Sequence, residues 1–316
     1  MNLGDTAAQS KSILDEVEKA IVGKRPALEK VLLTVLCDGH VLIEDYPGLA
    51  KTLMAKTFAA TLGCDFKRVQ FTPDLLPADI TGTYVFDRKT SEFTLRRGPV
   101  FTNVLLADEI NRSPPKTQAA LLEAMQERQT TLEGETHPLE SPFVVIATQN
   151  PIEYEGTYPL PEAQIDRFLM RIAIGYPTRE QEREILTRRI RRKEDDVRVA
   201  RVSSPQQVVG MQRAIEEVHV DEALESYIVD IVSRTRTHPQ VDVGASPRGS
   251  LALLKLARAR AALRGRDFVV PDDVKEVAVE GLAHRLILKP DPWIKGVRTT
   301  SVVQEVLTSV PVPKVD

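Results

Sequence analysis

The sequence predicts an α/β protein whose first half is a parallel sheet flanked by helices and whose second half is helical. Short apolar runs alternate with helical patterns up to about residue 176, and helical patterns dominate from Pro177 onward. This alternation is typical of buried parallel strands joined by crossover helices. With 316 residues, the chain has the length of about two domains. We therefore expect a core domain over residues 1–176 and a helical domain over residues 177–316.

Four apolar runs mark the strands expected in the sheet. They are residues 40–44 (HVLIE), 104–107 (VLLA), 143–148 (FVVIAT) and 168–174 (FLMRIAI). A helix is expected over Lys51–Leu62, because apolar residues recur on one of its faces and Gly63 follows as a stop. A second helix is expected to start at Ser113 and Pro114, a cap and a first-turn proline, and to run to about Arg128.

The second half carries the helical period in five segments. They are Arg179–Arg192, Pro205–Val218, Glu222–His238, Pro247–Leu263 and Pro271–Leu288. Several begin with a capping side chain or a proline, as Ser246 and Pro247 do. Two segments of the first half instead alternate on both sides of a polar turn, which predicts β-hairpins. These are Thr83–Arg97 and Gln129–Leu139.

Composition excludes several classes of protein. The chain is 42% hydrophobic and 28% charged, as soluble globular proteins are, and unlike disordered or collagen-like chains. No stretch reaches the roughly 18 apolar residues of a membrane span. The N-terminus lacks a secretory pattern, so we expect a cytoplasmic protein with Cys37 and Cys64 reduced. A net charge of −3 gives no basic excess for nucleic acid, and the histidines lack zinc-ligand spacing.

The residues between the first strand and its helix suggest a phosphate-binding loop. Residues 44–52 read EDYPGLAKT, and the amides and dipole of a helix N-terminus favour an anion there. Lys51 can then reach the β- and γ-phosphates, and the Thr52 hydroxyl can bind Mg²⁺. Asp45 and Ala50 replace both glycines of the strict pattern, so we expect a negative φ at Ala50. An ordinary strand-to-helix turn is the alternative for this segment alone.

Polar residues at the ends of later strands extend this candidate site. Asp108 and Glu109 directly follow the second apolar run. There Asp108 can hold Mg²⁺, and Glu109 can orient and deprotonate the attacking water. Asn150 follows the third run, and its amide can hold that water or the γ-phosphate. Taken alone, Asp108 and Glu109 have the alternative of a capping or salt-bridging pair, and Asn150 has that of an Asn-Pro turn. Parallel sheets, however, bind ligands at the carboxyl ends of their strands, where all three residues are expected.

Two arginines are candidates for neutralising charge on a transferred phosphoryl group. Arg167 lies in PEAQIDRFLM, and Arg248 lies in the first turn of the helix that Ser246 caps. An arginine in this role raises the rate about 10³–10⁵-fold in known cases. A local pair with Asp166 is the alternative for Arg167, and a solvated first-turn position is the alternative for Arg248.

In this order and combination, the motifs resemble those of the MoxR family of the AAA+ ATPases. The matching segments are residues 21–25, 44–52, 71–82, 97–128, 147–168 and 244–261. The resemblance implies a P-loop NTPase core with a C-terminal helical lid and Mg²⁺-dependent hydrolysis of ATP. It also places the chain in the helix-two-insert clade of these ATPases. There Thr83–Arg97 would be the helix-two insert, and Gln129–Leu139 would be the pre-sensor-1 hairpin.

The resemblance implies a role for each residue near the nucleotide. Lys51 and Thr52 would be the Walker A pair, Asp108 and Glu109 the Walker B pair, and Asn150 sensor 1. The residues expected to contact ATP are Ile21, Val22 and Gly23 at the adenine, followed by Pro47, Gly48, Leu49, Ala50, Lys51, Thr52 and Leu53 at the phosphates.

The arginines take their implied roles from an assembly of subunits. Arg167 would be the arginine finger for the neighbouring subunit's nucleotide, with Arg112 and Arg171 as alternatives, and Arg248 would be sensor 2. A finger acting in trans requires a closed ring, which a heterologous interface can form. The resemblance implies a homo-oligomeric hexamer that acts as a chaperone in maturing client proteins, often by metal or cofactor insertion. It also implies a separate partner with a von Willebrand factor A (VWA) domain.

Three other functions remain open at this point. A nucleic-acid motor of the same clade is suggested by the basic run 188–193 (RRIRRK), although acidic residues 194–196 follow it and favour a solvated face. We therefore expect no nucleic-acid partner. A chelatase-like subunit shares the architecture, and a nucleotide-switched scaffold without hydrolysis is suggested by the altered loop.

Overall fold

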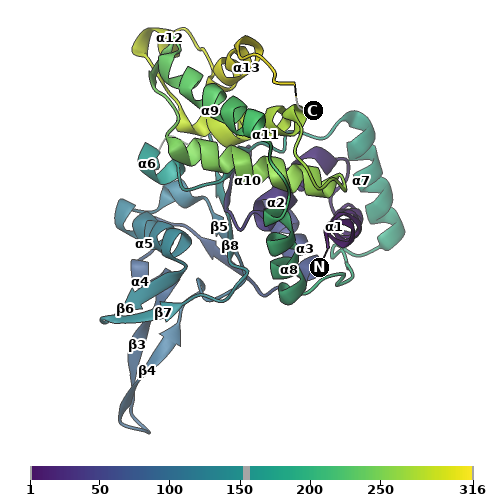
Figure 1. Ribbon diagram of the computed structural model, residues 1–316. Coiled ribbons are helices and arrows are strands. Elements are labelled where there is room, and N and C mark those ends of the chain that lie inside the picture. Colours follow the sequence, from purple (N-terminus) through teal and green to yellow (C-terminus); the bar gives the residue numbers. More distant parts are fainter. Residues whose placement is uncertain (1, 152–156, 315–316) are drawn as a thin grey trace.

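A five-stranded parallel sheet forms the centre of the core domain, with its strands in the order β2–β5–β8–β1–β9. The computed structural model describes residues 2–151 and 157–314. The strands are β1 (Val41–Glu44), β2 (Phe66–Gln70), β5 (Val104–Asp108), β8 (Val144–Gln149) and β9 (Met170–Ile172). The predicted α/β fold with a parallel sheet is thus confirmed, and Figure 1 shows the helical lid beside it.

Each face of the sheet packs against its own set of helices. One face buries Val41, Ile43, Val104, Leu106, Val144 and Ile146 against α1 (Leu3–Val17), α2 (Arg25–Leu36) and α3 (Lys51–Leu62). The other buries Leu42, Leu105, Ala107, Val145 and Ala147 against α4 (Pro77–Thr81) and α5 (Pro115–Glu127). Successive side chains of a strand point to opposite faces, so runs that are apolar throughout serve both layers. Each fully buried aliphatic side chain stabilises the fold by about 1.5–3 kcal/mol.

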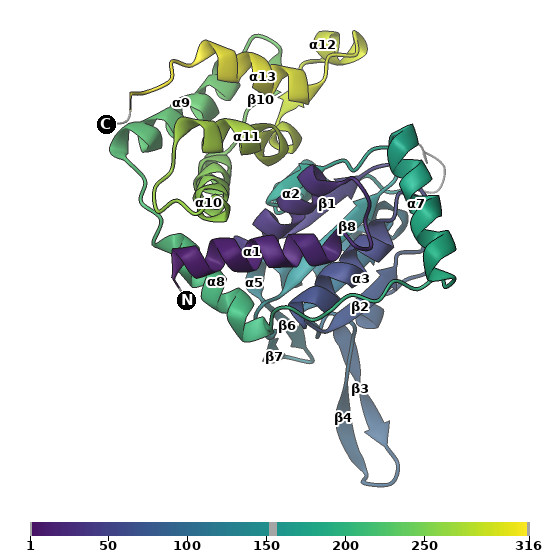
Figure 2. The ribbon, with the colours of Figure 1, turned by 90° about the vertical axis from the view of Figure 1, so that its right-hand side faces the viewer.

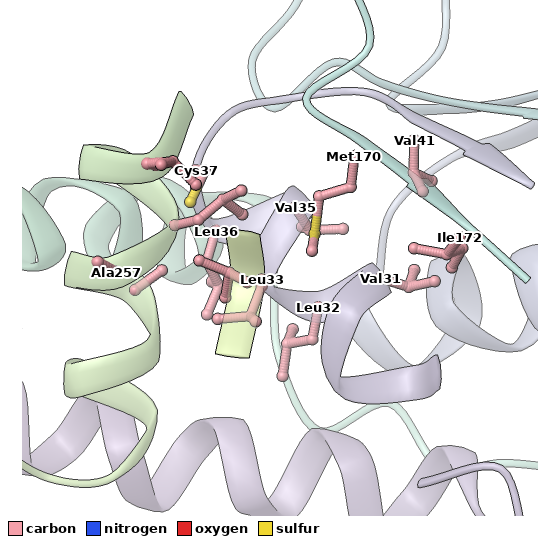
Figure 3. Packing of buried hydrophobic residues seen from close by; sticks show 14 of the residues in the cluster. Val31, Leu32, Leu33, Val35, Leu36, Cys37, Val41, Met170, Ile172 and Ala257 are labelled. Atoms are coloured by element: carbon pink, nitrogen blue, oxygen red, sulfur yellow. The ribbon is translucent and has the colours of Figure 1, made fainter. Parts of the chain in front are cut away.

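Helix α2 joins the sheet to the lid. Figure 3 shows Val31 and Val35 beside Ile172 and Met170 of β9, while Leu36 lies toward the lid helix that carries Ala257. The core of the lid is continuous with this cluster. The lid therefore sits on the β9 side of the sheet, and α2 transmits its position to the core.

Up to residue 314, the lid consists of helices and one short ribbon, β10–β11. Its elements are α8 (Pro205–Glu216), α9 (Glu222–Thr237), β10 (Val241–Val243), α10 (Pro247–Leu263), α11 (Pro271–Leu282), the 3₁₀ turn η2 (Ala283–Arg285), β11 (Ile287–Leu288), α12 (Pro290–Ile294) and α13 (Thr299–Ser309). Helix α7 (Arg179–Arg192) precedes them and, within the described residues, buries no side chain. In Figure 2 it runs along the core, away from the lid helices.

Both predicted hairpins are present. Strands β3 (Gly82–Asp87) and β4 (Glu92–Arg97) form the first, and β6 (Gln129–Leu132) and β7 (Glu135–Pro138) form the second. The β3–β4 hairpin projects from the body in Figure 2. Tyr84 ties the hairpins together, since its hydroxyl donates to Glu135 Oε2 at 2.6 Å.

Several boundaries differ from the sequence prediction. Helix α5 starts at Pro115 with Pro114 as its cap, because Ser113 instead ends the 3₁₀ turn Ile110–Arg112. Helix α11 ends at Leu282 rather than Leu288, because Ile287 and Leu288 pair with β10. The strand expected over 168–174 is confined to Met170–Ile172.

Two further observations concern the whole chain. Cys37 and Cys64 are free, buried thiols, and burial raises the pKa of Cys64 to about 12. Across the described ranges, no helix has both the length and the apolar character needed to cross a bilayer.

Candidate functional site

A cavity of about 400 Å³ opens at the carboxyl ends of β1, β5 and β8. Its lining residues are Pro47, Gly48, Leu49, Ala50, Lys51, Thr52, Leu53, Asp108, Glu109, Thr148, Gln149 and Asn150. The structure therefore brings together the expected phosphate loop, the acidic pair and the asparagine. Thr148 and Gln149 are additions that the sequence interpretation missed.

The phosphate loop turns through the left-handed backbone region twice. Gly48 has φ +81°, and a Cβ there would meet no atom within 4 Å. Ala50, the N-cap of α3, has φ +57°. The prediction of a negative φ at Ala50 is wrong, because the chain must reverse sharply between the loop and the first helical residue, Lys51. This conformation costs an L-residue about 1–2 kcal/mol.

Asp45 ties the loop to the exit of β9. Its carboxylate is buried, and Oδ2 accepts from the backbone N–H of Ile174 at 2.7 Å and of Gly175 at 2.6 Å. Oδ1 accepts from the Tyr46 N–H at 2.9 Å. Asp45 thus satisfies three buried or half-buried donors, which a glycine at this position cannot do.

Lys51 folds back over the loop that precedes it. Its ammonium donates to the carbonyl oxygen of Asp45 and, at 3.1 Å, to that of Tyr46. The side chain therefore lies at the loop, at the start of α3, where the helix dipole also favours negative charge. This corner of the cavity is electrostatically suited to a polyphosphate.

Asp108 is held by two neighbouring strands. Its Oδ1 accepts from Thr148 Oγ1 of β8 at 2.6 Å. Its Oδ2 accepts from Arg68 of β2, at 3.1 Å from Nε and 2.7 Å from Nη2. Asp108 and Thr52 thus present a carboxylate and a hydroxyl oxygen to one cavity, and Mg²⁺ prefers such ligands. The residues fit a magnesium ion.

Glu109 is fixed beside it by its backbone and its side chain. It adopts φ +57°, and its N–H donates to Thr148 Oγ1 at 2.9 Å. Its Oε2 accepts from Gln70 Nε2 at 2.7 Å and pairs with Arg112 Nε at 3.0 Å. Arg112 therefore acts on the subunit's own acidic pair. Arg68 and Gln70 were missed because β2 is an edge strand without a continuous apolar run.

The segment expected at the adenine, residues 21–23, contacts α7. Ile21 is buried in the turn between α1 and α2. The carbonyl of Gly23 accepts from Gln181 Nε2 of α7 at 3.0 Å, and a Cβ on Gly23 would collide with that side chain. Among the described residues, Ile21, Val22 and Gly23 are not in the lining of the cavity.

Arg167 and Arg248 line a different cavity, of about 370 Å³. Asp38 and His40, which precede β1, share this lining. Because Arg167 likewise precedes β9, this cavity lies at the amino ends of the strands, on the opposite edge of the sheet from Lys51. The structure brings the two arginines together but not with the phosphate loop.

Asp166 links Arg248 to a further arginine, Arg285. Arg248 contacts its Oδ2 at 3.4 Å, and Arg285 from η2 bonds its other carboxylate oxygen. Arg171 instead pairs with Glu44 at 3.2 Å. Of the arginines considered as fingers, Arg167 alone lines the second cavity together with Arg248, in the part of the chain that the structure describes.

The sequence matches known proteins over nearly its whole length. Residues 40–170 match the ATPase family associated with various cellular activities (AAA), and residues 233–306 match the AAA lid domain. The chain is 46% identical to Chaperone MoxR1 of Mycobacterium tuberculosis, over 95% of this chain and 81% of that protein. It is 31% identical to Protein MoxR of Methylorubrum extorquens, over 93% and 91% of the two chains.

A solved structure shows the same fold. It is that of a putative ATPase from Cytophaga hutchinsonii, which superimposes with a TM-score of 0.92 over 98% of this chain and 96% of that one, at 42% identity. Together with the parallel sheet, the lid and the cavity at Lys51, these matches establish that the chain belongs to the MoxR family of AAA ATPases, which are ATP-hydrolysing enzymes.

Proposed function

We propose that this chain hydrolyses Mg²⁺-bound ATP in the cavity at the carboxyl edge of the sheet and uses the energy as a chaperone on protein partners. The observation that carries the proposal is the convergence of Lys51, Thr52, Asp108, Glu109 and Asn150 on one cavity. Relatives named MoxR, one of them a chaperone, support the second part. Ile21, Val22 and Gly23 would complete the adenine contacts.

The residues of the cavity divide the chemistry among them. Lys51 and the amides of α3 would neutralise the phosphate oxygens. Thr52 and Asp108 would hold Mg²⁺, which when bound stabilises the charge of the phosphates. Glu109, oriented by Gln70, would accept the proton of the attacking water, and Asn150 would position that water.

A role in trans is proposed for both Arg167 and Arg248. They line the cavity at the amino edge of the sheet, away from their own subunit's Lys51. An arginine there reaches a γ-phosphate only if another subunit presents its carboxyl edge to it. This head-to-tail arrangement supports a ring, for which we propose six subunits. We propose residues 1–176 as the core domain and 177–316 as the second domain, in which α7 lies along the core and the lid helices begin at α8.

The partners are proposed to be proteins. A client and a separate VWA-domain protein would complete the system. We propose no nucleic-acid role for the basic run 188–193. Within it, Arg188 pairs with Glu184 at 2.9 Å and Arg189 with Asp195 at 2.6 Å. Such local pairs are typical of a solvated helix face.

Steady-state hydrolysis of ATP against protein concentration tests the proposal. Wild type should show activity per subunit that rises with concentration, because the site is completed between subunits. Glu109→Gln should bind ATP with wild-type affinity and lose hydrolysis by a factor of at least about 100. Hydrolysis that Glu109→Gln leaves intact would contradict the assignment of the base. Activity independent of concentration down to the monomer would contradict the shared site.

A further inference from the structure

Two neighbouring lid residues bond the backbone on both sides of Arg167. Arg285 donates from Nη1 to the carbonyl oxygen of Asp166 at 2.6 Å and from Nη2 to that of Phe168 at 2.8 Å. His284 Nε2 lies 3.0 Å from the same Phe168 oxygen. The flanking residues of Arg167 are thus held by η2 of the lid, and not by the core alone.

The contact is buried and charged. The side chain of Arg285 is 3% exposed, and it also bonds the Asp166 carboxylate. Its Nε donates to the Gly281 carbonyl of α11 at 2.8 Å, which fixes the guanidinium to the lid helix. A planar guanidinium satisfies several acceptors at once in a fixed geometry, which lysine does not. Breaking a buried pair of this kind leaves an uncompensated charge.

Arg167 itself is weakly held by comparison. Its Nε is buried and finds no hydrogen-bond partner among the described residues. The direction of its side chain therefore depends on the backbone at residues 166 and 168. Both carbonyls there are bonded by Arg285, and the Asp166 carboxylate is shared between Arg285 and Arg248.

We infer that Arg285 is a positioning residue for the arginine finger: it couples the lid to the Arg167 loop, so that the lid sets where the finger is presented to the next subunit. The inference rests on the proposed role of Arg167 in trans. Arg285 touches no nucleotide in its own subunit, because it lines the cavity at the amino edge of the sheet. A movement of the lid in one subunit thereby changes the turnover number at the phosphate cavity of its neighbour.

Arg285→Met removes the bonds and keeps much of the side-chain volume. We expect the turnover number to fall about 10-fold to 100-fold, as for a catalytic group displaced by about an ångström, with the affinity for ATP unchanged. Arg285→Lys keeps the charge but not the forked guanidinium. Its turnover number should lie between those of wild type and Arg285→Met. Arg260→Met is the matched control: Arg260 also joins lid to core, through Glu29 at 2.6 Å, but lies away from Arg167. It should retain turnover.

Complementation distinguishes a mispositioned finger from a damaged subunit. Arg285→Met keeps a complete phosphate cavity, whereas Glu109→Gln keeps a complete finger. In a randomly mixed ring, about a quarter of the interfaces join an intact cavity to an intact finger. Activity of the mixture should therefore exceed the sum of the separate activities. Arg167→Ala mixed with Glu109→Gln calibrates the same recovery.

Each outcome bears on a different claim. Recovery with both variants supports the inference. Recovery with Arg167→Ala but not with Arg285→Met overturns it and leaves the proposed function standing. Absence of recovery with Arg167→Ala overturns the arrangement in trans, and the inference with it.

If thermal unfolding shows that Arg285→Met does not fold, Arg285→Lys carries the same comparison. Equal losses in Arg260→Met and Arg285→Met would also overturn the inference, since general lid docking would then explain both.

Discussion

Asp45 and Ala50 both stand where the strict phosphate-loop pattern has glycine, and the structure gives them opposite consequences. Asp45 contributes acceptors to three backbone N–H groups and joins the loop to the end of β9. Ala50 contributes no such bond and adopts a left-handed conformation that disfavours its Cβ. The first replacement strengthens the loop, and the second stores strain in it.

Ala50→Gly should therefore stabilise the protein. Relief of the left-handed strain is worth about 1–2 kcal/mol, and the greater freedom of glycine in the unfolded chain offsets part of it. The expected gain in the free energy of unfolding is about 1 kcal/mol, measured by urea denaturation. Ala60→Gly is the control, because Ala60 is exposed on the same helix. It should lose about 1 kcal/mol. A loss of that size at Ala50 would contradict the strain argument.

At the scale of elements, the local sequence pattern predicts those strands that are buried along their whole length. Strands β5 and β8 were predicted because their apolar runs face helices on both sides. Strand β2 was not predicted, because at the sheet edge it carries Lys67 and exposed Arg68 among its apolar residues. Its side chains Arg68 and Gln70 are nonetheless the ones that hold the acidic pair.

The position of an element relative to distant ones was beyond the sequence. The motif around Arg248 predicts a capped helix, which the structure confirms with Ser246 as N-cap. The docking of the lid decides which edge of the sheet this helix faces. The lid docks through contacts between α2 and α10, which no local hydrophobic period encodes. For the same reason the sequence did not indicate that Arg285 holds the loop of Arg167.

His40 joins two elements and predicts a dependence of stability on pH. Its Nδ1 accepts from the Val145 N–H of β8 at 2.9 Å, so Nε2 carries the proton and donates to the Met125 carbonyl at the end of α5, at 3.1 Å. Burial lowers the pKa of His40 from 6.5 to about 3. The unfolded chain thus binds a proton that the folded chain excludes, and stability falls as the pH drops from about 6.5 toward 3.

The contribution of His40 can be isolated by substitution. Between pH 7 and pH 5, wild type should lose about 2 kcal/mol more of its free energy of unfolding than His40→Gln does, from about 1.4 kcal/mol per pH unit below 6.5. His284 is also buried with a lowered pKa, but it is present in both proteins and cancels. Urea denaturation at the two pH values measures the difference. Equal losses would show that His40 becomes protonated without cost in the folded state.

At the scale of the whole molecule, the sheet separates two halves of one proposed catalytic site. The phosphate cavity opens at the carboxyl ends of the strands, and the cavity of Arg167 and Arg248 opens at their amino ends. Four residues of β1 alone span about 13 Å between these edges. A single subunit therefore carries the phosphate cavity at one edge and the two arginines at the other, which is the geometry of a head-to-tail interface.

This arrangement predicts how two inactive variants affect wild-type subunits. An excess of Arg248→Ala should lower activity per wild-type site, because most wild-type cavities then face a neighbour without that arginine. An excess of Lys51→Ala should largely preserve it, because those subunits lose their own phosphate site but keep both arginines. Hydrolysis at constant wild-type concentration and rising variant concentration measures the contrast. If Arg248 served its own subunit's cavity, neither excess would lower activity per wild-type site.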